Sequence, residues 1–253
     1  MPDVNPGIMA RLIAVNRDWS RRVDEALGNC RVDTSQDFSR MLRQYLRPGI
    51  CVLDVGGGRG PTIPLDVKAS YGLRIIGLDI SQDELDGAPP GSYDQTICGD
   101  VCLPFSLPEV DLAISFAVTE HVKQPAAMYA NIYQALRVGG VTLNFMPNKF
   151  AAFALLNACV PNAITKRAMN LLRPGMRGRQ GFPGYYRNCY PSRLAALLRE
   201  IGFQNVEFRM YYYSDYFTSF LPAHLLELGW QRFTSWLGSP DLCEAFSVCA
   251  CKP

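Results

Sequence analysis

A short apolar run that ends in an acid and then breaks into glycines constrains this chain more than any other feature. The run occupies residues 51–61 and reads CVLDVGGGRGP. Such a pattern indicates a buried strand that turns sharply into a loop and then a helix. Gly56, Gly58 and Gly60 can adopt positive φ angles or let backbone amides approach a ligand, because glycine has no Cβ. The segment therefore predicts a ligand-binding loop at the end of a strand.

The spacing of these glycines distinguishes the loop from two other nucleotide-binding loops. The pattern G-x-G-x-x-G, started at Gly56, needs a glycine at position 61, where the chain has Pro61. A P-loop is excluded as well, because no Gly-Lys-Ser/Thr follows. The pattern that fits is acid-x-Gly-x-Gly-x-Gly, which begins at Asp54.

Further segments follow the glycine loop in a fixed order. They are strand-like runs with their following loops, at residues 73–81, 97–105, 110–122 and 136–148. Alternation of strands and helices over this stretch predicts a parallel, doubly wound sheet that binds ligands outside the carboxyl ends of its strands. Together with the glycine loop, the series resembles the class I S-adenosylmethionine-dependent methyltransferases over residues 50–148.

The resemblance implies a fold and a cofactor. The fold is α/β, a Rossmann-like doubly wound sheet of seven strands with an antiparallel last strand and a helical insert, and the cofactor is S-adenosyl-L-methionine. Residues 136–148 then correspond to a helix end, a glycine turn and the fifth strand. Sequence patterns add a helix over 192–203 that ends at Gly202 and a sixth strand over 206–213. Residues 244–252 resemble the antiparallel seventh strand.

Individual residues of these segments can be assigned to parts of the cofactor. Asp79 closes a strand-like run 19 positions after Gly60, where acids of α/β nucleotide-binding sheets accept hydrogen bonds from ribose hydroxyls. The resemblance assigns Asp100 and Val101 to the adenine and the loop after the fourth strand to the methionine moiety. The full expected set is Asp54, Gly56, Gly57, Gly58, Gly60, Asp79, Ile80, Asp100, Val101 and Phe116. Alternatively, Asp79 and Asp100 serve as helix caps or turn residues.

The candidate catalytic residues come from two segments. Methyl transfer is an in-line displacement, so alignment of acceptor and methyl group does most of the work. A hydroxyl acceptor also loses a proton, and His121 lies in the loop after the fourth strand, where the acceptor is expected. The alternative for His121 is a structural histidine or a cap. Tyr186 and Arg187, beside Tyr185, are the second candidates, because they can orient an anionic substrate.

The chain is expected to form a single methyltransferase domain over residues 1–253. Its parts are N-terminal helices in 1–48, a cofactor-binding core in 49–148, a helical substrate cap in 149–191 and the C-terminal part of the sheet in 192–253. Apolar spacing predicts an amphipathic helix over 8–28 and a second helix over 35–46. Another helix is expected within residues 215–238.

The charge distribution is uneven although the net charge is only +2. Between His121 and Arg199 the chain has no acids and eleven bases, namely Lys123, Arg137, Lys149, Lys166, Arg167, Arg173, Arg177, Arg179, Arg187, Arg193 and Arg199. Such a block favours anionic partners. The alternative is a solvated basic face balanced by the acid-rich first part of the chain. The insert loosely resembles those of methyltransferases that modify bacterial glycans and lipids, which suggests a cap that closes over an anionic acceptor.

The expected function is therefore methyl transfer to O or N of a small-molecule or lipid- or glycan-linked acceptor. Two alternatives stay open: an RNA methyltransferase, although the motifs of base-modifying families are missing, and a cofactor-binding pseudo-enzyme. The nine cysteines lack Cys-x-x-Cys pairs, so reduced thiols and no metal site are expected. No signal-peptide core or run of ~18 apolar residues is visible, which makes a cytoplasmic location the expectation and leaves peripheral membrane contact open.

Overall fold

The computed structural model describes residues 6–28, 32–159 and 182–253. Contacts divide the chain into two compact units. The sheet unit consists of Asp33–Lys149, Pro183–Met210 and Ala245–Pro253. The helical unit consists of the described residues of Met1–Val32, Phe150–Phe182 and Tyr211–Glu244. The expected single-domain layout stays a prediction, and the two units are described separately.

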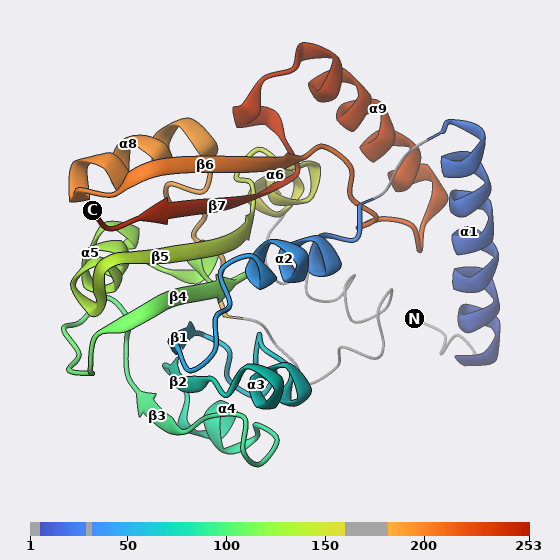
Figure 1. The fold of residues 1–253 in the computed structure, drawn as a ribbon. Helices are drawn as coiled ribbons and strands as arrows, with labels where there is room; N and C mark the ends of the chain where they lie inside the picture. Colours follow the sequence, from blue (N-terminus) through green and yellow to red (C-terminus); the bar gives the residue numbers. More distant parts are fainter. Residues whose placement is uncertain (1–5, 29–31, 160–181) are drawn as a thin grey trace. The chain divides into compact units, whose positions relative to one another are not determined.

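The sheet has seven strands in the described part of the chain, in the order β3-β2-β1-β4-β5-β7-β6 (Figure 1). The strands are β1 Cys51–Val55, β2 Arg74–Asp79, β3 Gln95–Cys98, β4 Val110–Phe116, β5 Leu136–Pro147, β6 Gln204–Tyr211 and β7 Ala245–Cys251. Strands β1 to β5 pair in parallel, and β7 is antiparallel to β5. The predicted doubly wound sheet with an antiparallel last strand is confirmed. The strand order reverses between β1 and β4, so a ligand crevice is expected at their carboxyl ends.

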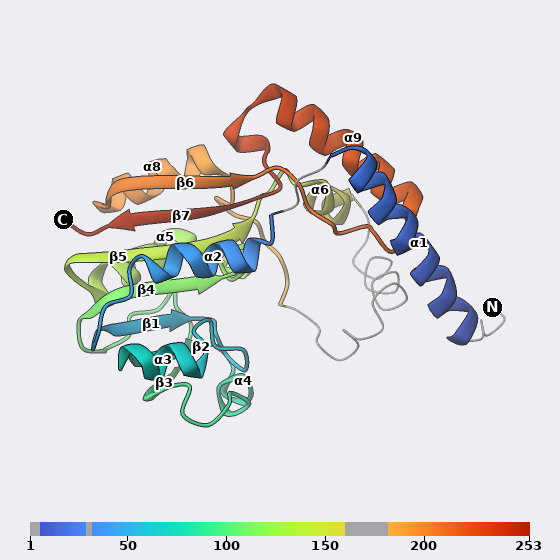
Figure 2. The same ribbon diagram turned by 45° about the vertical axis from the view of Figure 1, so that its right-hand side comes forward.

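The central strands are apolar because both of their faces are covered. In β1, Val52 and Leu53 are fully buried, and in β4 so are Ala113 and Ile114. Strands buried on both faces form near-continuous apolar runs, which is why the sequence revealed them. Helices flank both faces: α2 and α3 lie on one, α5 and α8 on the other (Figures 1 and 2). The helices are α2 Thr34–Arg43, α3 Leu65–Tyr71, α4 Gln82–Asp86, η1 Thr119–His121, α5 Pro125–Ala135 and α8 Pro191–Ile201.

One boundary in the sheet unit differs from the sequence expectation. The helix end expected at this position is present, since α5 ends at Ala135 with Leu136 as its C-cap. The expected glycine turn is wrong, because β5 already begins at Leu136. Leu136 pairs with Val110, and the register shifts before Leu112 pairs with Val141. Lys252 fixes this end, since its Nζ donates to the Leu136 carbonyl at 2.6 Å. Tertiary pairing therefore overrides the local glycine signal.

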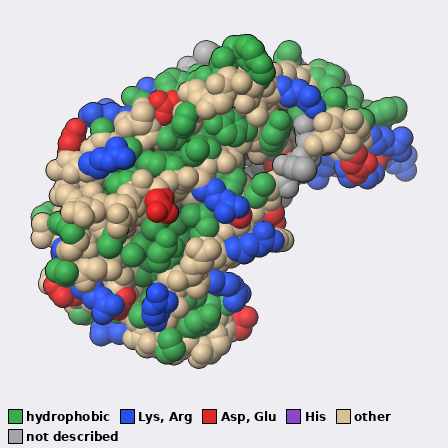
Figure 3. Space-filling model, turned by 45° about the horizontal axis from the view of Figure 1, so that its top comes forward, with side chains coloured by type: hydrophobic (Ala, Val, Ile, Leu, Met, Phe, Trp, Pro, Cys, Tyr) green, Lys and Arg blue, Asp and Glu red, His purple; other side chains and the backbone are tan. Residues whose placement is uncertain are grey.

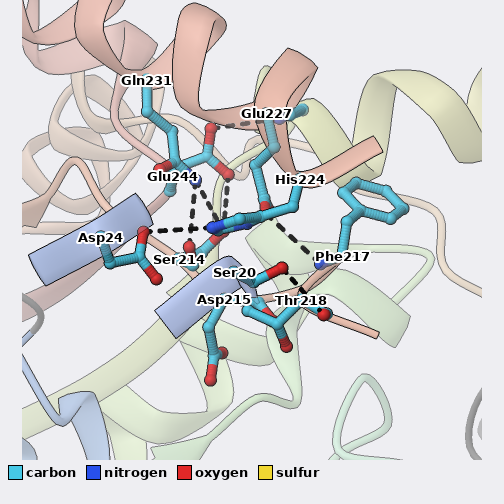
Figure 4. A network of polar contacts seen from close by, with 11 residues as sticks. Ser20, Asp24, Ser214, Asp215, Phe217, Thr218, His224, Glu227, Gln231 and Glu244 are labelled. Atoms are coloured by element: carbon cyan, nitrogen blue, oxygen red, sulfur yellow. Dashed lines mark hydrogen bonds and ion pairs between the residues drawn. The ribbon is translucent and has the colours of Figure 1, made fainter. Parts of the chain in front are cut away.

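The helical unit contains α1 Pro6–Ala26, α6 Ala152–Cys159, α9 Leu221–Leu237 and η3 Pro240–Leu242. A buried polar network ties α1 to α9 (Figure 4). The fully buried His224 lies between two carboxylates, with Nε2 3.1 Å from Asp24 Oδ1 and Nδ1 3.3 Å from Glu227 Oε2. Ser214 Oγ donates to Glu227 at 2.9 Å and lies 3.3 Å from Glu244 Oε2. Each buried carboxylate therefore has hydrogen-bond partners, as burial of a charge requires.

The first helix is present as predicted, although its apolar residues do not face the interior. Ile8, Leu12, Val15 and Trp19 are each more than half exposed. Polar side chains make hydrogen bonds to α9 and to the segment before it: Asn16 Oδ1 accepts from Leu221 N at 2.9 Å, and Ser20 Oγ donates to the Thr218 carbonyl at 3.0 Å. The regular apolar spacing therefore predicted the helix but not its buried face.

The basic block is only partly within the described residues. Lys166, Arg167, Arg173, Arg177 and Arg179, and with them most of the expected cap, lie outside the described residues. On the face shown in Figure 3, Lys and Arg side chains lie interspersed with hydrophobic and uncharged ones. None of the described helices is long and apolar enough to cross a membrane.

Candidate functional site

Asp54 organises the glycine loop from beneath. It lies in β1, is fully buried, and accepts hydrogen bonds from Thr62 N at 2.8 Å and Thr62 Oγ1 at 2.7 Å. Burial raises the pKa of Asp54 to about 6. The two bonds close the loop over residues 56–62, so the acid of the motif shapes the loop rather than standing free beside a ligand.

Steric contacts explain why the loop needs glycine at consecutive positions. Gly56 and Gly58 have φ angles of 70° and 46°, which side chains rarely adopt. A Cβ on Gly57 would lie 2.5 Å from Asp54 Oδ2, and one on Gly58 would lie 2.9 Å from Asp79 Oδ2. Nothing lies within 4 Å of the corresponding point on Gly60. The first three glycines are thus required by packing, and the last is not.

Tyr93 and Thr62 support this loop, and the sequence analysis missed both. Tyr93 Oη donates to the Gly58 carbonyl at 3.0 Å. Its ring occupies the space beside Gly77, where a Cβ would lie 2.8 Å from Tyr93 Cγ. A glycine inside a strand often marks such a close approach, so Gly77 in β2 is the signal that could have revealed an aromatic neighbour.

Asp79 lies at the carboxyl end of β2 beside the loop. Its Oδ1 accepts from Ser81 N at 2.9 Å, and its Oδ2 faces Gly58. Burial raises the pKa of Asp79 above its usual value. The next residue, Ile80, is 58% exposed. Asp79 is thus brought to the glycine loop, as the sequence predicted, with one oxygen directed toward it.

Asp100 and Val101 lie in the connection after β3. Asp100 is exposed, and its Oδ1 accepts from Cys102 N at 2.9 Å, which is the turn role left open by the sequence. Val101 is buried, and its carbonyl accepts from Asn131 Nδ2 at 2.8 Å. Gly99 N donates to the Asp79 carbonyl at 2.8 Å. This connection therefore begins beside the end of β2.

The end of β4 is held by aromatic contacts and a strained residue. Phe116 stacks on Phe145, with 4.4 Å between ring centroids, and meets Phe38 edge-on at 5.2 Å. The following Ala117 has a φ of 57°, a conformation that is uncommon for non-glycine residues and often found at functional sites. Its N–H donates to the Phe145 carbonyl at 2.9 Å. The turn brings Val118 against Gly56.

The candidate catalytic residues come together just beyond this turn. Tyr185 N and Tyr186 N both donate to the Glu120 carbonyl, at 2.6 and 3.0 Å. His121 Nδ1 lies 3.2 Å from the Pro183 carbonyl. Arg187 Nη1 donates to the Lys123 carbonyl at 3.2 Å. Two segments that are about 60 residues apart in the sequence therefore form one cluster, as their joint assignment to the acceptor site requires.

Glu120 is the residue of this cluster that the sequence analysis missed. Its side chain is almost completely buried, and burial raises its pKa to about 8. Its Oε2 has no hydrogen-bond partner within the described residues, and its Oε1 lies 3.8 Å from His121 Nε2. The adjacent acid and histidine in the sequence TEHV were a signal, but their burial could not be read from it.

The family assignment follows from the central part of this fold. Residues 53–143, which run from β1 into β5, match the family model of the methyltransferase domain. This region therefore matches the methyltransferase domain family, and its sheet has the fold of class I S-adenosylmethionine-dependent methyltransferases. The resemblance seen in the sequence is thereby confirmed for the domain that carries the glycine loop.

Two curated relatives match parts of this chain. An uncharacterized methyltransferase of Mycolicibacterium gilvum (strain PYR-GCK) is 31% identical over 122 residues, which is 47% of each chain. The 24-methylenesterol C-methyltransferase 2 of Oryza sativa subsp. japonica is 24% identical over 166 residues, which is 62% of this chain and 42% of the relative. The chain thus spans less than half the length of these relatives.

Solved structures share the methyltransferase fold at low identity. A SAM-dependent methyltransferase from Archaeoglobus fulgidus gives a TM-score of 0.56 at 16% identity and covers 91% of this chain and 98% of that one. Phosphoethanolamine N-methyltransferase 2 of Haemonchus contortus, solved with S-adenosyl-L-methionine, gives a TM-score of 0.57 at 17% identity. The match covers 86% of this chain and 52% of that one. At these identities the likeness shows the fold alone.

Proposed function

We propose that this methyltransferase binds S-adenosyl-L-methionine at the carboxyl ends of β1, β2 and β4 and transfers its methyl group to O or N of an anionic acceptor. The acceptor is a small molecule or a lipid- or glycan-linked group. The observation that carries the proposal is the glycine loop, where added Cβ atoms would meet Asp54 and Asp79. That packing sets one Asp79 oxygen toward the loop, which suits a ligand with ribose hydroxyls.

Individual roles for the cofactor site follow from this arrangement. Asp79 is held by Ser81 N through Oδ1, so Oδ2 is the oxygen that would accept from the ribose. The exposed Ile80 and the connection at Asp100 and Val101 would flank the adenine. When bound, the cofactor supplies an electrophilic methyl group on a sulfonium. Phe116, fixed by its two ring contacts, would support the methionine moiety.

The acceptor side is proposed to be the cluster around His121. His121 would remove the acceptor proton, and Tyr186 and Arg187 would orient the acceptor. Lys123 and Arg187 supply positive charge there, with Lys123 Nζ 5.6 Å from the centroid of the Tyr185 ring. Two cations close to one another favour an anionic group. We also propose a cytoplasmic location, which the free thiols among the described cysteines support.

Binding and transfer can be tested separately. Calorimetry should show that S-adenosylmethionine and its demethylated product bind, whereas stabilisation by NAD or ATP alone would contradict the proposal. Incubating metabolite and lipid pools with methyl-labelled cofactor should then label a small anionic product. Labelled RNA with steeply salt-dependent binding would favour the RNA alternative. Cofactor binding with no labelled product in any pool would favour the pseudo-enzyme.

A further inference from the structure

The pair formed by Glu120 and His121 has a geometry that the acceptor role of His121 alone does not explain. Both side chains leave the short helix η1 at the carboxyl end of β4. The ring of His121 is bracketed, with Nδ1 3.2 Å from the Pro183 carbonyl and Nε2 3.8 Å from Glu120 Oε1. A protonated ring would thus have an oxygen near each N–H, which is the arrangement that stabilises an imidazolium.

The backbone holds Glu120 in this position. Its carbonyl accepts two hydrogen bonds, from Tyr185 N and Tyr186 N, and Tyr186 itself has a φ of 50°. Its Oε2 is buried without a partner in the described chain. A buried carboxyl oxygen without a hydrogen-bond partner destabilises the folded state. Such a cost at the end of β4, next to the candidate base, points to a functional reason for the acid.

Among the described residues, an ion-pair contact joins Glu120 to His121. The titratable groups on which the Glu120 charge acts from the elements packed against it are Tyr129 of α5 and Cys189. Burial raises the pKa of both groups far above the neutral range, so neither changes charge near pH 8. The cations on the adjoining segments are Lys123, Lys149 and Arg187.

We propose that Glu120 is a positioning residue that controls the basicity of His121. The inference rests on the proposed function. The His121 ring would take the proton as the acceptor X–H bond breaks. S-adenosylmethionine, when bound, would supply the methyl group that X receives, and the electron pair of the broken C–S bond would stay on sulfur. The Glu120 carboxylate then stabilises the imidazolium. Glu120 can give this support only when its own carboxyl is ionised.

Burial sets the pH at which this state forms. The carboxyl of Glu120 ionises at about pH 8, so the carboxylate that supports His121 accumulates as the pH rises through that value. Methyl transfer by the wild type should therefore rise through the same range. In Glu120→Gln the side chain keeps its size but cannot ionise, and that rise should disappear.

The first test needs no acceptor. The chain has only two histidines, His121 and His224, so the ring signals of ¹³C-labelled histidine can be assigned with a His121→Gln variant. In the wild type, the His121 signals should show a step at about pH 8 from Glu120 ionisation, and Glu120→Gln should lack it. The exposed Glu109 provides the matched control, since Glu109→Gln makes the same charge change and should keep the step.

Each result of this titration decides the inference. If the wild-type His121 signals lack the step, the inference is overturned, and this result does not depend on the folding of the Glu120→Gln variant. The same step in Glu120→Gln also overturns it. With an acceptor found in the labelling screen, Glu120→Gln should lose at least about tenfold in turnover while KM stays near the wild-type value. Equal pH profiles in both proteins would leave Glu120 only a structural role. Failure to bind S-adenosylhomocysteine would instead contradict the proposed function.

Discussion

Replacing Asp79 by alanine tests the cofactor site most directly. Of its two oxygens, Oδ1 is already used by Ser81 N, and Oδ2 faces Gly58. The substitution therefore removes one charged acceptor from the ribose. Loss of a hydrogen bond to a charged group costs about 1.5–3 kcal/mol, which corresponds to a rise in Kd of roughly 10- to 150-fold.

The same substitution should leave the fold intact. Burial raises the pKa of Asp79, which means that ionised Asp79 is less favourable in the folded state than in the unfolded state. Its contribution to the free energy of unfolding is present at low pH and lost as the pH rises through its raised pKa. At pH 7.5 the alanine variant should thus melt at or above the wild-type temperature, apart from a small loss at the Ser81 amide.

Titration calorimetry with S-adenosylhomocysteine measures the affinity, and a thermal scan without ligand measures the stability. Asp83→Ala is the matched control, because Asp83 is an exposed acid on the neighbouring helix α4. We expect Asp83→Ala to keep the wild-type Kd. An unchanged Kd in Asp79→Ala, or an equal change in both variants, would refute the assignment of the ribose to Asp79.

Four further substitutions address the loop, the base and the helical unit. Gly57→Ala should abolish cofactor binding measured by calorimetry, since its Cβ would lie 2.5 Å from Asp54 Oδ2, whereas Gly60→Ala, with open space around it, should bind normally. His121→Ala should lower turnover in the labelled-methyl assay about 100-fold or more with little change in cofactor Kd; lost stability with unchanged turnover would make His121 structural. Burial raises the pKa of Glu244 from 4.5 to about 7, so its contribution to the free energy of unfolding should be lost as the pH rises between these values. Urea unfolding should show that the free energy of unfolding falls less over this pH range in Glu244→Gln than in wild type. Equal pH dependence in the two proteins would contradict the raised pKa of Glu244.

The parts of the fold that could be predicted are those whose signals are local. The glycine loop, the apolar central strands and the left-handed glycine that ends α8 each depend on neighbouring residues alone. The position of Asp79 followed from its distance in sequence to the loop. The start of β5 was missed because Leu136 is held by Val110 and Lys252, which are distant in sequence.

Parts of the site were missed for the same reason, because their contacts join residues that are distant in sequence. Tyr93 reaches the Gly58 carbonyl across 35 positions, and Glu120 receives the amides of residues 185 and 186. Neither contact leaves a periodic pattern. The fully buried His224 is a similar case in the helical unit, since its partner Asp24 is 200 positions away. Sequence patterns therefore predicted which residues form the candidate cofactor site but not which residues hold them in place.

The two ends of the connection between β5 and α8 are joined in the sheet unit. Lys149 N donates a hydrogen bond to the Cys189 carbonyl at 2.8 Å. A few residues before Cys189, the amides of Tyr185 and Tyr186 donate hydrogen bonds to the Glu120 carbonyl. A chain that departs and returns at one place closes a loop, and doubling the length of such a loop costs only about 0.6 kcal/mol. Insertions or deletions between Lys149 and Pro183 should therefore have little effect on the free energy of unfolding of the sheet unit. The segment that the sequence predicts to be an acceptor cap can consequently vary in length while the glycine loop keeps its geometry.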